Sequence, residues 1–380
     1  MQVKRVLGWT ALAIPLAVVG AVFVAYWMSD NACGEGNPAV PGDPVKAILY
    51  CDYGSADVLK LEDIEKPAPG DGELLVRVRA ASVNPLDWHY MRGTPYLIRL
   101  DSGLRKPEEL RLGVDFSGTV EAVGRNVTRF KPGDDVFGGR TGAFGEYVVV
   151  REDRAVVRKP PGVSFEQAAA VPIAALTALQ ALRDVGQVQP GQKVLINGAS
   201  GGVGTFAVQL AKHFGAQVTG VCSTRNLEMV RSLGADEVID YTKEDFTEGS
   251  ERYDLIVDMV GNHSLSKLRS VMEPDGKTIL VGDSEMGNWI GPLVRPVTAL
   301  LYSKFANEQF IPILADLNQE DLALVGELIQ TGRVTPVIDR RYSLAEVPDA
   351  LRYLEKGHAR GKVVVLLQPE SGAEPVAAGL

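Results

Sequence analysis

The feature that most constrains the fold is a glycine cluster between a strand-like and a helix-like segment. Residues 193–210 read KVLINGASGGVGTFAVQL, so an apolar run breaks into glycines and then resumes. Ala199, Gly201 and Gly204 stand in A-x-G-x-x-G spacing at this junction. Small residues there permit a tight turn, close approach of the backbone to a pyrophosphate, and contact between helix and sheet. The pattern predicts dinucleotide binding; a tight strand-to-helix turn without a ligand is the alternative.

From residue 193 onward, apolar strands alternate with amphipathic helices. The predicted strands are KVLIN, QVTGVC, EVIDY, YDLIVDMV and GKTILVG, and the predicted helices are TFAVQLAKHFG, NLEMVRSLG and HSLSKLRSVM. Continuous apolar strands between such helices indicate a parallel sheet that is covered on both faces. The sequence therefore predicts an α/β fold with a doubly wound, nucleotide-binding parallel sheet in residues 169–312.

Residues 45–168 show a different pattern, of short strands separated by turns. GELLVRVRAASV alternates apolar with charged residues, as a half-buried strand does, and Pro-Gly-Asp turns occur at 69–71 and 132–134. Short strands with regular turn signals predict a small β-barrel or sandwich. The chain of 380 residues is long enough for about two such domains.

Composition limits the classes of partner. The net charge is −9 and the folded part holds no dense run of Lys and Arg, which argues against nucleic acid and favours a small-molecule partner. Three cysteines, Cys33, Cys51 and Cys222, lie far apart in the sequence and in no metal-binding spacing. We therefore expect no disulfide framework and no four-cysteine zinc lobe.

The N-terminal residues 1–30 are predicted to anchor the protein in a lipid bilayer. Residues 6–28 are uncharged and mostly apolar, and 23 residues of helix span a hydrocarbon core of about 30 Å. A cleaved signal peptide and a lipoprotein modified at Cys33 are the alternatives. Residues 31–44 are rich in Gly and Pro and are predicted to form a linker.

The side of the membrane on which the body lies is predicted from two conflicting signals. Lys4 and Arg5 precede the apolar run and acidic residues follow it, which would place the body outside the cytoplasm. An intracellular dinucleotide cofactor argues for the opposite side. Since two positive charges are a weak signal, we expect the body to face the cytoplasm.

The residues after the second strand of the sheet predict the type of dinucleotide. Proteins selective for NAD usually carry Asp or Glu about 20 residues after the glycines, whereas this chain has VCSTRN at 221–226 and no acid before Glu228. The hydroxyls of Ser223 and Thr224 and the guanidinium of Arg225 suit a 2′-phosphate. The predicted cofactor is NADP(H). Alternatively, the hydroxyls only cap the next helix and Arg225 is solvated.

Further motifs connect these two regions to a known family. The chain resembles the zinc-independent medium-chain dehydrogenase/reductase superfamily, in its quinone oxidoreductase-like, reticulon-4-interacting-protein-like branch. This resemblance implies a GroES-like catalytic barrel over 45–168, a Rossmann domain over 169–312, a C-terminal segment over 313–368 that returns to the barrel, and a tail over 369–380. The motifs are ASVNPLD (81–87), GVDFSGTVEAVG (113–124), KPGDDVFG (131–138), GAFGEYV (142–148), INGASGGVG (196–204), LGADEVIDY (233–241) and GKVVVLL (361–367).

Comparison with zinc-dependent relatives predicts that the site holds no metal. Those relatives place Cys–His where this chain has Asn84–Pro85, and His–Glu where it has Val114–Asp115. A catalytic zinc needs three protein ligands, and without a Lewis acid alcohol oxidation is difficult. The resemblance implies hydride transfer from NADPH to a quinone or an α,β-unsaturated carbonyl acceptor. The alternative function is a non-catalytic NADPH-binding or membrane scaffold protein.

The resemblance also assigns site residues. It implies that one set binds the cofactor: Asn84, Thr177, Ser200, Gly201, Gly202, Val203, Gly204, Ser223, Thr224, Arg225, Tyr241, Val260, Gly261, Gly361 and Lys362. A second set is assigned to catalysis: Asn84, Asp87, His89 and Tyr90.

Several of these assignments have structural alternatives. Asn84 and Asp87 could only fix a loop, and Tyr241 could be a strand-end aromatic whose hydroxyl lies in water. His89 occupies the place of a Tyr that quinone reductases often carry near the substrate. It could donate a proton near neutral pH, or it could be a loop histidine. The apolar stretch 287–312 is expected to line the acceptor site or the interface of a homodimer.

Overall fold

The computed structural model describes Cys33, residues 43–282, Gly287, Arg295, residues 297–299 and residues 307–367. The predicted anchor at 6–28, most of the linker and the tail lie outside the described residues. Within the described ranges, none of the helices combines the length and apolar character needed to cross a bilayer. The membrane anchor therefore stays a prediction.

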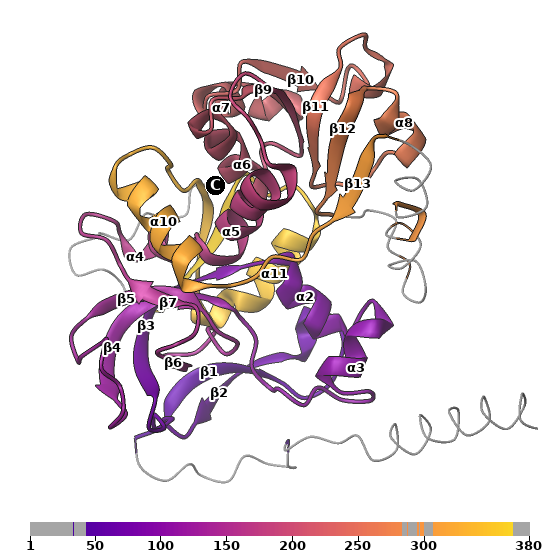
Figure 1. Ribbon diagram of the computed structural model, residues 1–380. Coiled ribbons are helices and arrows are strands. Elements are labelled where there is room, and N and C mark those ends of the chain that lie inside the picture. The colour runs from indigo at the N-terminus through magenta and orange to yellow at the C-terminus, as the bar shows by residue number, and fades with distance from the viewer. Residues whose placement is uncertain are drawn as a thin grey trace, which may run out of the picture.

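The N-terminal half forms the predicted barrel (Figure 1). A six-strand path in the order β14-β15-β3-β4-β5-β7 makes most of it, and β6 pairs with β3 beside that path. A separate antiparallel pair, β1 with β2, packs nearby. The strands from this half are β1 (Val45–Tyr50), β2 (Leu59–Ile64), β3 (Glu73–Val83), β4 (Asp115–Val123), β5 (Asp135–Gly139), β6 (Tyr147–Arg151) and β7 (Val156–Arg158).

The second half forms the predicted parallel sheet, in the order β10-β9-β8-β11-β12-β13. Every neighbouring pair is parallel. The strand order reverses between β8 and β11, and ligands of such sheets bind outside the carboxyl ends of the strands at that point. The strands are β8 (Lys193–Asn197), β9 (Gln217–Cys222), β10 (Glu237–Asp240), β11 (Tyr253–Asp258), β12 (Met272–Leu280) and β13 (Gln309–Pro312).

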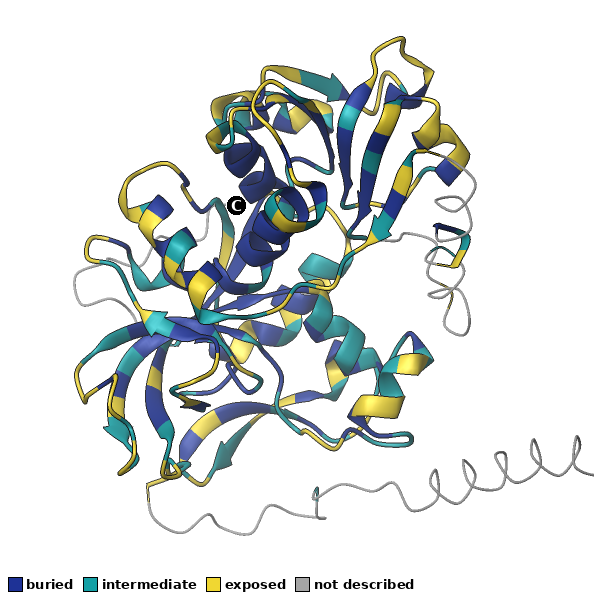
Figure 2. Cartoon of the chain, in the orientation of Figure 1, coloured by how far each residue is buried: buried dark blue, intermediate teal, exposed yellow. Residues whose placement is uncertain are grey.

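Two helices lie between the parallel sheet and the barrel and form much of the core. In α5 (Pro172–Gln180) every residue except Ile173 is buried, and in α6 (Gly202–His213) the run Gly204–Ala211 is buried. Figure 2 shows both helices as a dark blue centre between the two sheets. The remaining helices include α2 (Pro85–Arg92), α3 (Arg99–Ser102), α4 (Phe165–Ala169), α7 (Leu227–Ser232), α8 (Leu265–Arg269), α10 (Gln319–Gln330) and α11 (Val347–Glu355).

The C-terminal strands rejoin the barrel. β15 (Lys362–Leu366) runs antiparallel to β3, with Val363 opposite Val83, and β14 (Ile338–Ser343) runs parallel to β15. This pairing places the start of β15 beside the glycine cluster, where Gly361 forms a bridge with Gly201. The limits of the individual domains stay predictions.

A disulfide contradicts the cysteine prediction. Cys33 is bonded to Cys51, with 5.8 Å between the two Cα atoms. The expectation of no disulfide was wrong for this pair. Pairing depends on distance in space, and folding brings these two cysteines together although they are 18 residues apart in the sequence. Cys222 is a free, buried cysteine, and burial raises the pKa of its thiol to about 11.

Candidate active site

The glycine cluster forms a tight connection from β8 to α6. Gly198 has a φ of +90°, and a Cβ added at Gly204 would lie 2.1 Å from the Gly198 carbonyl oxygen. Gly201 precedes the helix and no side chain caps its first amides. The first N–H groups of a helix have no partner inside it and attract anions. Gly201, Gly202, Val203 and Gly204 thus lie where the predicted pyrophosphate needs donors.

The C-terminal segment lies directly against this loop. The Gly361 amide donates to the Ser200 carbonyl oxygen at 2.9 Å. A Cβ added at Gly202 would lie 3.2 Å from Cδ of Lys362, and one added at Gly361 would lie 2.4 Å from the Val337 carbonyl oxygen. The structure therefore brings Ser200, Gly202, Gly361 and Lys362 together, although the sequence separates the two pairs widely.

Lys362 is the centre of a buried polar cluster on the barrel side. Its side chain is only 3% exposed; its ammonium donates to Asn84 Oδ1 and lies 3.4 Å from Asp115 Oδ2. Asn84 Nδ2 and Ser82 Oγ each donate to the same Asp115 oxygen at 2.9 Å. The other Asp115 oxygen accepts from the Ile173 amide at 3.0 Å and so ties the start of α5 to the cluster.

Ser82 and Asp115 were missed as site residues by sequence reasoning. Asp115 was noted only as the residue that replaces a zinc ligand of relatives, although it is the counter-charge of Lys362 and accepts a hydrogen bond from Asn84. The signal that could have found it is the buried strand DFSGTV, in which an acid is unexpected without a partner.

Asp87 caps the helix that follows Asn84. Its Oδ2 accepts from the Asn84 amide at 2.7 Å, and the side chain is 2% exposed. Burial raises the pKa of this carboxyl to about 7, and the nearby Asp115 charge adds to the rise, whereas amide hydrogen bonds lower it. The geometry supports the loop-fixing interpretation of Asp87.

The other two catalytic candidates on α2 form their hydrogen bonds outside this cluster. The His89 Nδ1 atom lies 2.8 Å from the Thr94 carbonyl oxygen, so Nδ1 carries the hydrogen. Burial lowers the pKa of the imidazole, which favours its neutral form. The Tyr90 hydroxyl donates to Asp101 at 3.4 Å. Neither contact joins these side chains to Asn84 or Lys362.

Thr177 lies on α5, where its hydroxyl donates to the Ile173 carbonyl oxygen at 2.7 Å.

At the switch point, Asn197 and Asp258 from adjacent strands are joined by a 2.8 Å hydrogen bond. The same Asp258 oxygen accepts from the amides of Val260 and Gly261, at 3.2 and 2.9 Å. Asp258 was not predicted, yet it fixes the loop that carries Val260 and Gly261, two residues predicted to bind the cofactor.

The residues predicted to bind the 2′-phosphate follow β9. Thr224 donates to Asp240 at 2.6 Å, and Arg225 Nη2 donates to the His358 carbonyl oxygen at 2.7 Å, which links this loop to the C-terminal segment. The Thr224 hydrogen bond is the main reason why the pKa of Asp240 lies well below its usual range. Lys243 balances this carboxylate at 3.2 Å. Tyr241 is 53% exposed.

These residues fit a phosphate-bearing dinucleotide. The start of α6 offers uncapped amides, Arg225 offers a guanidinium, and Ser223 offers a hydroxyl. In addition, the Oδ1 atom of Asn226 is buried without a hydrogen-bond partner beside this loop. Among the residues that the structure describes, no group of three or more His, Cys, Asp or Glu side chains could hold a metal ion.

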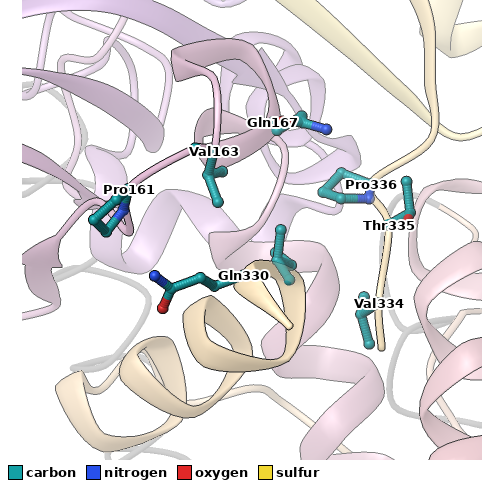
Figure 3. A pocket seen from close by; sticks show the side chains of 9 residues that line it. Pro161, Val163, Gln167, Gln330, Val334, Thr335 and Pro336 are labelled. Atoms are coloured by element: carbon teal, nitrogen blue, oxygen red, sulfur yellow. The ribbon is translucent and has the colours of Figure 1, made fainter. Parts of the chain in front are cut away.

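A separate cavity of about 160 Å³ lies away from these residues, between α10 and the segment around Val163 (Figure 3). The polar side chains that line it are Gln167, Gln330 and Thr335, and none of its lining residues is titratable. None of the predicted site residues lines it. We assign the active site to the switch point and not to this cavity.

Comparisons with known proteins show the family of the chain. Residues 70–161 match a family model described as an alcohol dehydrogenase GroES-like domain, and residues 233–365 match one described as a zinc-binding dehydrogenase. A chloroplastic quinone oxidoreductase of Triphysaria versicolor, QR1, is 34% identical over 342 residues, which is 85% of this chain and 99% of the relative. Human mitochondrial NAD(P)H oxidoreductase RTN4IP1 is 36% identical and covers 77% of this chain and 81% of its own.

Two further proteins widen the comparison. A chloroplastic NADPH-dependent alkenal/one oxidoreductase of Arabidopsis thaliana is 34% identical, over 84% of this chain and 79% of its own. The solved structure of a quinone oxidoreductase from Coxiella burnetii superimposes with a TM-score of 0.76 at 32% identity, over 86% of this chain and all of that one.

Proposed function

Because the chain belongs to the medium-chain dehydrogenase/reductase family, in its quinone oxidoreductase-like branch, we propose that it is an NADPH-dependent, zinc-free reductase of quinones or α,β-unsaturated carbonyls. Family membership makes it an oxidoreductase with a nicotinamide cofactor. The preference for NADPH and the class of acceptor are the proposal.

The observation that carries the proposal is the buried cluster of Lys362, Asn84 and Asp115 beside the glycine loop. By the resemblance, Asn84 and Asp115 stand where zinc-dependent relatives carry residues of their metal site. An ammonium has three N–H groups, and in the described part of the chain two of them contact Asn84 and Asp115. We propose that the third polarises the acceptor oxygen, which is the role that a metal would otherwise fill.

The proposed reaction requires the protein mainly to position the acceptor and to polarise its oxygen. When bound, NADPH supplies a hydride from the reduced nicotinamide. An enone takes the hydride at its β-carbon and a proton at its α-carbon, and a quinone takes the same two to become a hydroquinone; NADP⁺ is the other product. The protein must hold the acceptor against the nicotinamide and stabilise negative charge on its oxygen until water delivers the proton.

The selectivity for NADPH is proposed from the loop after β9. Ser223 and Arg225 supply donors that a 2′-phosphate can use, and the carboxylate of Asp240 is already paired with Thr224 and Lys243. Replacing Arg225 by Ala should lower the preference for NADPH over NADH by tenfold or more, because a hydrogen bond to a charged group contributes about 1.5–3 kcal/mol. Arg231→Ala, an exposed arginine on α7, is the matched control.

The first experiment follows oxidation of NADPH and of NADH by the full chain with quinones, enals and simple aldehydes as acceptors. Cofactor binding is measured in parallel. Turnover with quinones or enals and faster turnover with NADPH would support the proposal. Tight NADPH binding without turnover on any acceptor would favour the non-catalytic binding protein, whose supporting feature is the lack of an obvious acid or base in the site.

We also propose that residues 6–28 hold the body at a bilayer, where a lipophilic quinone or enal would be the acceptor. The Cys33–Cys51 disulfide adds an argument about the side, because cytosolic thiols are kept reduced. Together with Lys4 and Arg5 it weighs against the cytoplasmic side expected from the cofactor, and we propose the side opposite the cytoplasm instead. Alkylation of Cys33 and Cys51 in intact cells, before any reductant is added, would indicate the cytoplasmic side instead.

The acceptor can be tested separately from the anchor. Equal turnover of water-soluble and lipophilic acceptors by the full chain in bilayers would contradict a lipophilic substrate. The homodimer stays a prediction, since much of residues 287–312 lies outside the described part of the chain.

A further inference from the structure

Asn226 is a buried amide with an unusual set of partners. It ends the short helical turn Thr224–Asn226 after β9 and directly precedes α7, and it is 3% exposed. Asparagine at this position normally accepts from an amide of the following helix, but no such bond forms here. The side chain is therefore buried for another purpose than capping α7.

Its nitrogen connects the two loops that surround the predicted phosphates. Asn226 Nδ2 donates to Ser200 Oγ at 3.0 Å and to Ser223 Oγ at 3.2 Å. Ser200 belongs to the glycine loop, and Ser223 follows β9 at the predicted 2′-phosphate position. Both hydroxyls thus act as acceptors of the same amide.

That arrangement fixes what the two hydroxyls can still do. A serine hydroxyl has one O–H donor and two lone pairs, so a hydroxyl that accepts from Asn226 must direct its hydrogen elsewhere. Within the described residues, neither hydroxyl donates to a protein acceptor. Both hydrogens are therefore available to phosphate oxygens, one at the pyrophosphate and one at the 2′-phosphate.

The oxygen of the same amide lacks a partner. Asn226 Oδ1 is buried and accepts no hydrogen bond. An unsatisfied buried acceptor is unfavourable and is uncommon in folded proteins outside functional sites. Ribose hydroxyls are donors, and a dinucleotide that lies along the carboxyl ends of β8 and β9 brings one of them to this region.

We propose that Asn226 is a positioning residue for the cofactor: its nitrogen orients Ser200 and Ser223 so that they donate to the pyrophosphate and to the 2′-phosphate, and its oxygen accepts from a ribose hydroxyl. The inference rests on the proposed function, because it takes NADPH as the cofactor. It assigns the selectivity for NADPH to a residue beyond those that touch the 2′-phosphate. A purely structural role would instead be to tie the two loops together.

The test measures dissociation constants of NADPH and NADH on the full chain by fluorescence titration. Asn226→Ala is expected to weaken NADPH binding on the order of tenfold or more, and to weaken NADH binding less, since NADH has no group for Ser223. Ser223→Ala should weaken only NADPH binding in the parent. It should have no further effect on the NADPH-to-NADH ratio once Asn226 is replaced by Ala, because the hydroxyl is then no longer oriented.

The matched control is Asn318→Ala, which removes another asparagine with several partners, at the start of α10. It should lower the Tm and leave both dissociation constants unchanged. If Asn226→Ala lowers the Tm but keeps both constants within twofold, or if the Ser223 effect is equal in both backgrounds, the proposal is wrong and Asn226 only ties the loops together.

Two outcomes separate this proposal from the proposed function. If the parent binds NADH as tightly as NADPH, the predicted selectivity fails, and the coupling between Asn226→Ala and Ser200→Ala, measured with either cofactor, still decides the role of Asn226. Should Asn226→Ala not fold, Asn226→Asp keeps the size but replaces the donor by an acceptor; binding of both cofactors unchanged in that variant would overturn the proposal.

Discussion

The two ends of the proposed cofactor site are built in different ways. The nucleotide end uses residues close in sequence, from Ser200–Gly204 and from Ser223–Asn226, and most of its groups are neutral amides and hydroxyls. The proposed nicotinamide end uses Asn84, Asp115 and Lys362, with a sequence separation of 278 between the first and the last, and it depends on buried charges.

The two ends should therefore differ in how much a substitution lowers the free energy of unfolding. Neutral hydrogen-bonding groups contribute about 1 kcal/mol each, and the loss of one is modest. A buried charge that loses its counter-charge has a much larger effect on the free energy of unfolding, because it is left uncompensated in a medium of low dielectric constant. We therefore expect the barrel side of the site to respond far more strongly to substitution than the glycine loop.

The largest effect is expected at Lys362. Lys362→Met removes the cation and leaves Asp115, which is fully buried, without its counter-charge. The free energy of unfolding should fall by about 3–5 kcal/mol, and turnover should be lost. Urea denaturation of the full chain measures the first effect, and NADPH oxidation the second.

A double variant tests whether charge is the cause. Lys362→Met with Asp115→Asn removes both charges and should recover most of the stability, but not the activity. If the double variant is as unstable as the single one, the loss comes from packing of the lysine side chain, and the contrast between the two ends would not rest on charge.

The second effect concerns Asp87 and pH. The pKa of this carboxyl is raised from its usual value to about 7, mainly by burial, so the folded protein keeps a proton that the unfolded chain has already released. The contribution of this one group to the free energy of unfolding is therefore most favourable below the ordinary pKa of Asp and is lost as the pH rises towards 7. Asp87→Asn should remove this fall, which amounts to about 2–3 kcal/mol between about pH 5 and about pH 8.

Denaturation of both proteins at several pH values measures this difference. The amide oxygen that the substitution introduces can still accept from the Asn84 amide, so the cap of α2 is kept. If the free energy of unfolding depends on pH equally in the parent and the variant, Asp87 is ionised throughout this range. Buried charge on the barrel side would then destabilise the protein less than we infer.

The third effect belongs to the nucleotide end. In Gly204→Ala the added Cβ would lie 2.1 Å from the Gly198 carbonyl oxygen, so the start of α6 must move away from β8. Overpacking of this kind reduces the free energy of unfolding by about 1–3 kcal/mol, and cofactor binding should weaken because the loop amides move with the helix. Gly72→Ala, where no atom lies within 4 Å of the added Cβ, is the control. Unchanged NADPH binding in Gly204→Ala would contradict a phosphate site here.

The same contrast explains how much could be predicted from the sequence. The glycine loop and the residues after β9 were found because their chemistry lies in short, contiguous patterns, and the parallel sheet followed from its apolar strands. The counter-charge Asp115 and the amide Asn226 have no such pattern, since their roles depend on partners brought together by folding. The disulfide was missed for the same reason.

The smallest effect is expected at His89, the proton donor that the sequence offered for the barrel side. Its Nδ1–H donates to the Thr94 carbonyl oxygen, and burial lowers its pKa, so the ring is neutral at physiological pH and has no proton that it can readily release.

His89→Asn can keep the hydrogen bond to Thr94 and should change kcat/KM by less than about threefold, since that bond contributes about 1 kcal/mol or less. The pH–rate profile should also keep its shape. If an inflection of the parent between about pH 5 and about pH 7 disappears in the variant, His89 is the acid, and the barrel side would then hold its catalytic proton on a single residue of α2 rather than depending on the Lys362 cluster and solvent.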